Sequence, residues 1–204
     1  MKKIHAALTF ATAAFALMMT SSGALAQAPA SASASASAPT KSAESVALFM
    51  QMHTVLSHPR CVNCHPRDDI PKQGMDRHIH FPPMTRGPAD RGPLGLSCSA
   101  CHTDANYDPG RVPGAPNWHL APASMAWEGL SAGELCRSMN DRSKNGNRNL
   151  QATVKHLTDD ELVAWGWAPG ISINGTSREA VPMAKAEFNR IVIAWAKSGA
   201  ACPD

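Results

Sequence analysis

The chain has 204 residues, a length that suits one or two domains. Hydrophobic residues make up 44% of the chain and charged residues 17%, a composition that excludes both a disordered polyelectrolyte and an integral membrane protein. Lys and Arg number 19 against 16 Asp and Glu, which gives a net charge of +3 without the clustered basic patch of a nucleic-acid-binding protein. We therefore expect no nucleic-acid partner.

The first 26 residues have the pattern of a cleavable secretory signal peptide. Lys2 and Lys3 form a positively charged start, residues 6–19 are a short apolar run, and Ala24-Leu25-Ala26 is a small-residue cleavage site. The alternative is an uncleaved membrane anchor, but the apolar run is shorter than the roughly 20 residues that a spanning helix needs. We therefore expect export to the periplasm, an oxidising compartment, and a mature chain without a transmembrane segment.

Two regions of different composition follow the signal peptide. Residues 27–42 (QAPASASASASAPTKS) are rich in Ala, Ser and Pro and offer nothing to bury, so we predict a disordered linker. Residues 43–204 carry the apolar periodicity and the cysteines, and we predict that they form one folded domain. Within this domain, residues 57–122 are unusually rich in Pro and Gly, which predicts long loops.

Helical patterns dominate the remainder of the domain. Apolar residues at helical spacing over 46–56 predict one amphipathic helix, and those over 188–195 predict another that ends at Gly199. Two capping-box patterns, Ser131–Glu134 and Thr158–Glu161, each predict the start of a short helix. No segment alternates convincingly as a strand would. The sequence therefore predicts a mainly α-helical fold with long Pro/Gly-rich loops and little or no sheet.

Two CxxCH motifs carry the chemistry, Cys61-Val-Asn-Cys64-His65 and Cys98-Ser-Ala-Cys101-His102. This spacing is typical of c-type haem attachment, in which both thiols bond to the porphyrin and the following His is the proximal iron ligand. One zinc site built from the two CxxC pairs is the alternative, but such a site needs no His after each pair and is typical of reduced, intracellular proteins. We therefore predict two covalently bound haem c groups. Their thioether bonds are expected at Cys61, Cys64, Cys98 and Cys101, with His65 and His102 as proximal ligands.

Two cysteines remain outside the motifs, Cys136 and Cys202. Two leftover thiols in an exported protein indicate a disulfide, which would join the C-terminus to the helix after Ser131. Ligation of a haem iron by one of them as a thiolate is the alternative.

Each haem iron has a sixth position, for which His and Met side chains compete. A Met ligand raises the reduction potential and a second His lowers it. His80 lies between the motifs, before Phe81-Pro82-Pro83, where little else explains an ordered His. His58 is too close to Cys61 to cap its own haem, but it could reach the neighbouring iron. The other candidates are His53, His78, His119, His156, Met75, Met84, Met125 and Met183.

Several strings of the chain are those of a known family. The most distinctive are residues 58–66 (HPRCVNCHP), 112–122 (VPGAPNWHLAP), 162–170 (LVAWGWAPG) and 199–203 (GAACP). From about Phe49 to the C-terminus the chain resembles small exported dihaem cytochromes labelled as subunits of isoquinoline-oxidoreductase-type molybdenum hydroxylases. The family also shares His80-x-Pro-Pro and His156, so we rank His80, His156 and His58 first as candidate distal ligands.

The resemblance implies electron transfer to or from a periplasmic dehydrogenase, without molybdenum in this chain. We therefore expect an electron-transfer protein with two His ligands on each iron, not an enzyme. Its partner would be a periplasmic redox enzyme, such as a molybdenum hydroxylase, or an electron acceptor protein. The alternative is a haem enzyme, such as a small dihaem peroxidase or a sulfur-compound oxidase, with one open or thiolate-ligated iron. The chain is short for a two-domain peroxidase.

Overall fold

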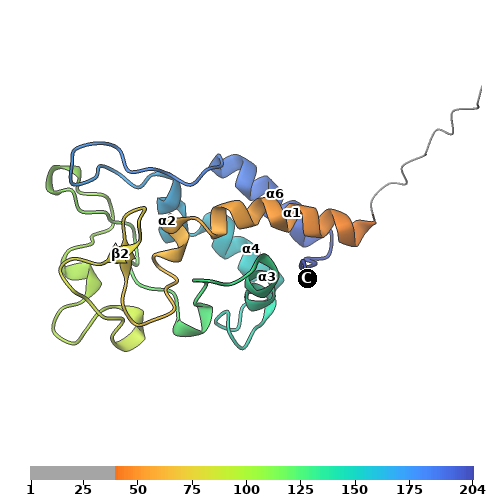
Figure 1. Cartoon of the computed structure of the whole chain (residues 1–204), viewed down its shortest axis with the longest axis horizontal. Helices are drawn as coiled ribbons and strands as arrows, with labels where there is room; N and C mark the ends of the chain where they lie inside the picture. The colour runs from red at the N-terminus through yellow and green to blue at the C-terminus, as the bar shows by residue number, and fades with distance from the viewer. Residues whose placement is uncertain (1–39) are drawn as a thin grey trace, which may run out of the picture. The chain divides into compact units, whose positions relative to one another are not determined.

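The computed structural model describes residues 40–204, which divide into a helical part and a loop-rich part (Figure 1). The regular elements are six α-helices and one antiparallel pair of two-residue strands, joined by long loops with single 3-10 turns. The predicted mainly helical fold with little sheet is confirmed for this part of the chain. The elements are α1 (Lys41–Leu56), α2 (Pro59–Val62), β1 (Lys72–Gln73), β2 (His78–Ile79), α3 (Ala132–Asn140), α4 (Leu150–Asp159), α5 (Glu161–Ala164) and α6 (Lys185–Lys197).

The first helix begins earlier than its apolar pattern predicts. Thr40 caps α1 by accepting a hydrogen bond from the N–H of Ala43 at 3.2 Å, so Lys41 and Ser42 belong to the helix. The last two residues of the predicted linker 27–42 are therefore helical. The predicted signal peptide and the rest of that linker, through residue 39, lie outside the described residues.

The core lies where α1 and α6 pack side by side, with α3 and α4 against them (Figure 1). Phe49 of α1 and Trp195 of α6 are fully buried, and their ring centroids lie 5.7 Å apart. The C-terminal helix follows the predicted apolar spacing and ends two residues before Gly199. None of the helices in residues 40–204 combines the length and the apolar character needed to cross a bilayer.

One of the two predicted capping boxes is confirmed. Ser131 Oγ accepts from the N–H of Glu134 at 3.3 Å, and the Glu134 carboxylate accepts from the N–H of Ser131 at 2.8 Å. The second is wrong, because Thr158 lies in the last turn of α4 and its hydroxyl donates to the carbonyl of Val154. Asp160 caps α5 instead, and α4 itself is a helix that the sequence patterns did not predict.

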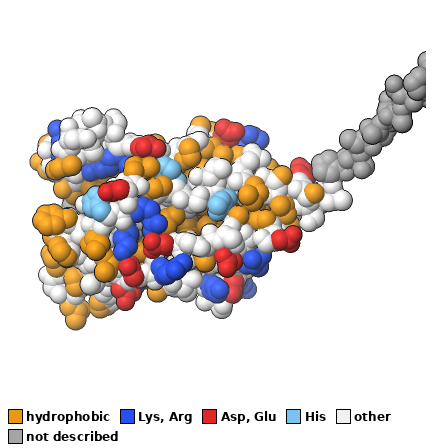
Figure 2. All heavy atoms as spheres, viewed as in Figure 1, with side chains coloured by type: hydrophobic (Ala, Val, Ile, Leu, Met, Phe, Trp, Pro, Cys, Tyr) orange, Lys and Arg blue, Asp and Glu red, His pale blue; other side chains and the backbone are white. Residues whose placement is uncertain are grey.

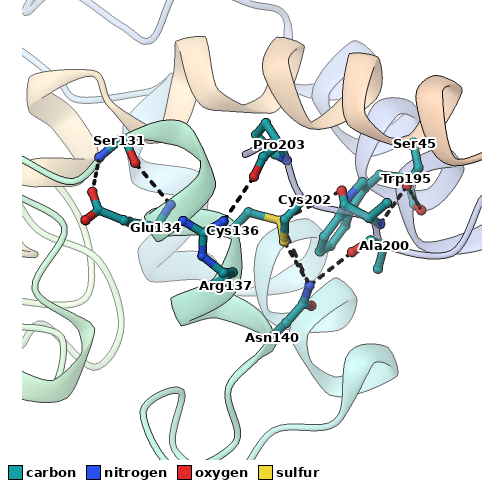
Figure 3. Close-up of a disulfide and its surroundings, with 11 residues drawn as sticks. Ser45, Ser131, Glu134, Cys136, Arg137, Asn140, Trp195, Ala200, Cys202 and Pro203 are labelled. Atoms are coloured by element: carbon teal, nitrogen blue, oxygen red, sulfur yellow. Dashed lines mark hydrogen bonds between the residues drawn. A yellow bond between two sulfur atoms is a disulfide. The ribbon is translucent and has the colours of Figure 1, made fainter.

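The disulfide between Cys136 and Cys202 is confirmed, with 5.5 Å between the two Cα atoms (Figure 3). It joins α3 to the segment after α6. Hydrogen bonds hold the same segment: the indole N–H of Trp195 donates to the carbonyl of Ala201 at 3.1 Å, and the N–H of Ala201 donates to the hydroxyl of buried Ser45 at 2.9 Å. The C-terminal segment is thus attached to α1, α3 and α6 together.

The loop-rich part is held by side chains that bind distant backbone. Arg86 is buried, and its guanidinium donates to Asp69 at 3.0 Å, to Asp90 at 2.8 Å, and to the backbone carbonyls of Asp68 and Ala121. One side chain thereby connects three segments that are separated in the sequence. The two carboxylates compensate the buried charge, as a buried guanidinium requires.

Candidate haem sites

The first CxxCH motif begins in α2. Pro59 occupies the first turn and the imidazole of His58 caps the helix, and the chain then continues in turns through Cys64 and His65. The N–H of Cys64 donates to the carbonyl of Cys61 at 3.1 Å, which places the two thiols one turn apart. Both thiols are free and partly buried, and burial is the main cause that raises the pKa of Cys61 to about 12.

His65 is fixed on two sides. Its Nδ1–H donates to the carbonyl of Met125 at 2.7 Å, and its ring stacks on Trp127 with centroids 3.5 Å apart and planes 12° from parallel. Burial is the main cause that lowers its pKa to about 3; the bond to Met125 opposes this shift, and the charges of His156, Arg86 and His119 add to it. The ring is therefore neutral near pH 7.

The second motif repeats this arrangement on a 3-10 turn over Cys98–Ala100. The Nδ1–H of His102 donates to the carbonyl of Pro113 at 2.7 Å, and the ring stacks on Trp118 at 4.6 Å and 10°. Burial is again the main cause that lowers the pKa of His102. Both motif histidines thus have a carbonyl acceptor and a parallel Trp.

The hydrogen bonds also fix which nitrogen is free. A backbone carbonyl can only accept, so Nδ1 of His65 and of His102 carries the proton and Nε2 of each neutral ring keeps its lone pair. This is the usual arrangement of a His that binds metal through Nε2, because the second bond fixes the tautomer and the ring orientation.

The two motifs border one cavity of about 820 Å³ in the loop-rich part. Cys64 of the first motif and Cys98 of the second both line it, and burial, followed by the charge of Cys98, raises the pKa of Cys64 to about 11. Figure 2 shows hydrophobic side chains gathered over this end of the molecule. The cavity walls include the motif residues Cys64, Cys98, Cys101 and His102, the aromatic residues Trp118 and Trp165, and the cationic residues Arg60, Arg111 and Arg178.

His80 faces His102 in this cavity. It follows the β1–β2 pair, its Nδ1–H donates to the carbonyl of Pro82 at 2.8 Å, and its ring centroid lies 5.8 Å from that of His102, with planes at 65°. Its Nε2 is therefore free in the same way as that of His102. Met84 and His119 also line the cavity, and Nδ1 of His119 contacts the carbonyl of Asn117.

His156 lies in the last turn of α4. Its Nδ1 donates to Asp160 Oδ2 at 3.1 Å, and this bond is the main cause that lowers the pKa of Asp160 to about 2. Nε2 of His156 is the ring nitrogen that this bond leaves free. The structure thus places His80 beside His102 of the second motif, and it leaves Nε2 of His156 free at the end of α4.

The remaining histidines are arranged differently. Nδ1 of His58 accepts from the N–H of Arg60 at 3.2 Å, so the proton of the neutral ring sits on Nε2, 3.8 Å from Glu179. The structure therefore uses His58 as a helix cap. His78 has both ring nitrogens in contacts, with Asp76 and with Gln73. His53 lies on α1, with a buried Nε2 that has no partner within the described residues.

Sequence reasoning found the motif residues but missed what surrounds their rings. The acceptors of the two motif histidines are the carbonyls of Met125 and Pro113, and a carbonyl has no sequence signature. Asp160 was part of the wrongly predicted second capping box, and a carboxylate four residues after a His in a helix was the available signal. Comparisons of the chain with protein-family models, with curated proteins and with solved structures found no match.

Proposed function

We propose that the chain is a periplasmic dihaem c-type cytochrome that carries electrons to or from a periplasmic oxidoreductase and has no substrate chemistry of its own. The observation that supports this most is the pair His80 and His102. Both rings belong to the wall of one cavity and lie next to each other. Each Nδ1 donates to a backbone carbonyl, so that both Nε2 atoms are free. Two such rings are suited to fill both axial positions of one iron.

The donor set of the chain fits two covalent haems. Four free cysteines lie in two CxxC pairs, and each pair is followed by a His whose tautomer is fixed. The indole N–H of Trp127 is buried without a hydrogen-bond partner in residues 40–204, and a haem propionate is an acceptor of the kind that it lacks. The guanidinium of Arg60 lines the cavity and lies 5.8 Å from the Trp165 ring, where it can compensate an anionic propionate.

A haem c, when bound, supplies an iron that changes oxidation state by one electron. The residues of the chain do the rest. Cysteine thioethers keep the group attached in both oxidation states, and two neutral imidazoles on one iron leave no position for a substrate. The mainly apolar walls of the cavity would exclude water from a haem that fills it, which favours little rearrangement on electron transfer.

The oxidised pair Cys136–Cys202 and the expected signal peptide support export. The identity of the partner comes from the resemblance alone, and a molybdenum hydroxylase of the periplasm is the class that it suggests. The haem-enzyme alternative requires an open or thiolate-ligated iron. Cys136 and Cys202 are joined to each other, so the described residues offer only the motif cysteines as free thiols.

The test is to produce the full chain in a host with c-type haem maturation and to measure its intact mass and its spectra. We expect the mass of the mature polypeptide plus two haems, a low-spin spectrum in both oxidation states, and no binding of carbon monoxide by the ferrous protein. A mass equal to that of the bare polypeptide would contradict the proposal and favour the zinc site. Two haems of which one binds carbon monoxide and turns over peroxide would favour the enzyme.

A further inference from the structure

His156 differs from His65, His80 and His102 in its hydrogen-bond acceptor. The rings of His65, His80 and His102 donate Nδ1–H to backbone carbonyls, which are neutral. His156 donates Nδ1–H to the carboxylate of Asp160, at 3.1 Å. The acceptor behind His156 is thus an anion, whereas the acceptors behind the other three rings are neutral.

Asp160 is fixed independently of His156. Its second oxygen, Oδ1, accepts from the N–H of Leu162 at 2.9 Å and from that of Val163 at 3.2 Å, which caps α5. The carboxylate cannot rotate away from His156 without losing both bonds. His156 lies in the last turn of α4 and Asp160 at the start of α5, so the turn between the two helices sets their distance.

The pairing of rings decides which site this acceptor serves. His80 and His102 face each other, so both belong to the Cys98–Cys101 site. Those two rings would then fill both ligand positions of one iron, so an iron that His156 binds through its free Nε2 would be that of the other motif, whose own His is His65. His65 and His156 are therefore the pair for the Cys61–Cys64 site.

We propose that Asp160 is a positioning residue that acts through His156 and makes the Cys61–Cys64 site the lower-potential one of the two. The inference rests on the proposed function. A carboxylate that accepts the Nδ1–H of a ligating imidazole increases the basicity of that ligand, and its negative charge stabilises the ferric state over the ferrous state. A neutral carbonyl does so less, so the Cys98–Cys101 site is reduced first.

The decisive variant is Asp160→Asn in the full chain with both haems attached. Asn caps a helix as well as Asp does, so its side-chain oxygen keeps the start of α5, while its NH2 group faces His156 and cannot accept the Nδ1–H; the variant therefore removes both the charge and the acceptor behind His156. A spectroelectrochemical titration is expected to show one midpoint potential shifted upward and the other unchanged, with the low-spin spectrum retained. The conservative variant Asp160→Glu keeps the charge and is expected to stay closer to the wild-type potential.

A matched control is Asp141→Asn. Asp141 also uses its carboxylate locally, as the acceptor for the N–H and the hydroxyl of Ser143 after α3, and it has no contact with a candidate ligand. Both potentials are expected to stay unchanged in this variant. A marker for the second site is His80→Met, because a Met ligand raises the potential of the haem that receives it.

The outcomes separate this inference from the proposed function. A wild-type chain without two low-spin haems contradicts the proposed function before any variant is needed. With two low-spin haems, unchanged potentials in Asp160→Asn would overturn the inference alone. A shift of both potentials by the same amount, or of the potential that His80→Met also raises, would overturn it as well. A thermal melt of each variant shows that the folded protein is being compared.

Discussion

His78 and His80 lie two residues apart at the end of the β1–β2 pair, and their rings are used differently. His78 is half exposed, and its two ring nitrogens contact Asp76 and Gln73. His80 faces His102 with a free Nε2. We expect His80→Ala to open one coordination position, so that about half of the ferrous haem binds carbon monoxide, because one of two sites loses its ligand. His78→Ala is the control and should bind none. Absorbance titration with carbon monoxide measures both, and equal behaviour of the two variants would contradict the assignment.

Individual residues also differ in whether the sequence alone predicts their role. The motif cysteines and His65 and His102 could be predicted as haem-site residues because porphyrin geometry requires a fixed local spacing. The leftover pair Cys136 and Cys202 could be joined by elimination. The stacking of His65 on Trp127 could not be predicted, because 62 positions separate the two residues and their contact depends on the path of a loop.

At the scale of elements, the two capping-box patterns give a matched pair of variants. Ser131 Oγ accepts a backbone N–H at the start of α3, whereas the hydroxyl of Thr158 only donates, to the Val154 carbonyl and the Asp159 carboxylate. We expect Ser131→Ala to lower the free energy of unfolding by about 1 kcal/mol. Thr158→Ala should change it by less than about 0.5 kcal/mol, as for substitutions away from caps and cores. Urea unfolding of both variants tests this, and a larger loss for Thr158→Ala would contradict it.

The elements also show where helix prediction from sequence works. Residues 46–56 and 188–195 bury one continuous apolar face against each other, and so their periodicity is visible. The helix α4 buries only Thr153 and Leu157 fully, which gives a weak pattern, and its cap Asn149 lies in a stretch with no Glu or Gln three residues later. The second capping-box pattern then fell at the end of this unrecognised helix.

At the scale of the whole molecule, the described chain has two parts that are stabilised by different interactions. The helical part has a conventional apolar core around Phe49 and Trp195. The loop-rich part surrounds the cavity and is held by long-range bonds such as those of Arg86, which no periodicity encodes. The sequence could therefore predict that loops surround the motifs, but not the paths that these loops take.

This division predicts the effect of removing the disulfide. Cys136 and Cys202 are separated by 66 positions, for which the chain-entropy model gives a stabilisation of about 4 kcal/mol. The bridge lies in the helical part (Figure 3), and the four motif cysteines are free thiols that take no part in it. We expect the double variant Cys136→Ala/Cys202→Ala to lose about this free energy of unfolding. Its haem content and both midpoint potentials should stay those of the wild type.

Denaturant unfolding followed separately by haem absorbance and by tryptophan fluorescence measures both parts. Lost haem attachment would show that the helical part is needed to form the cavity. Unchanged stability would show instead that the hydrogen bonds of Trp195 and Ser45 hold the C-terminal segment without the bridge.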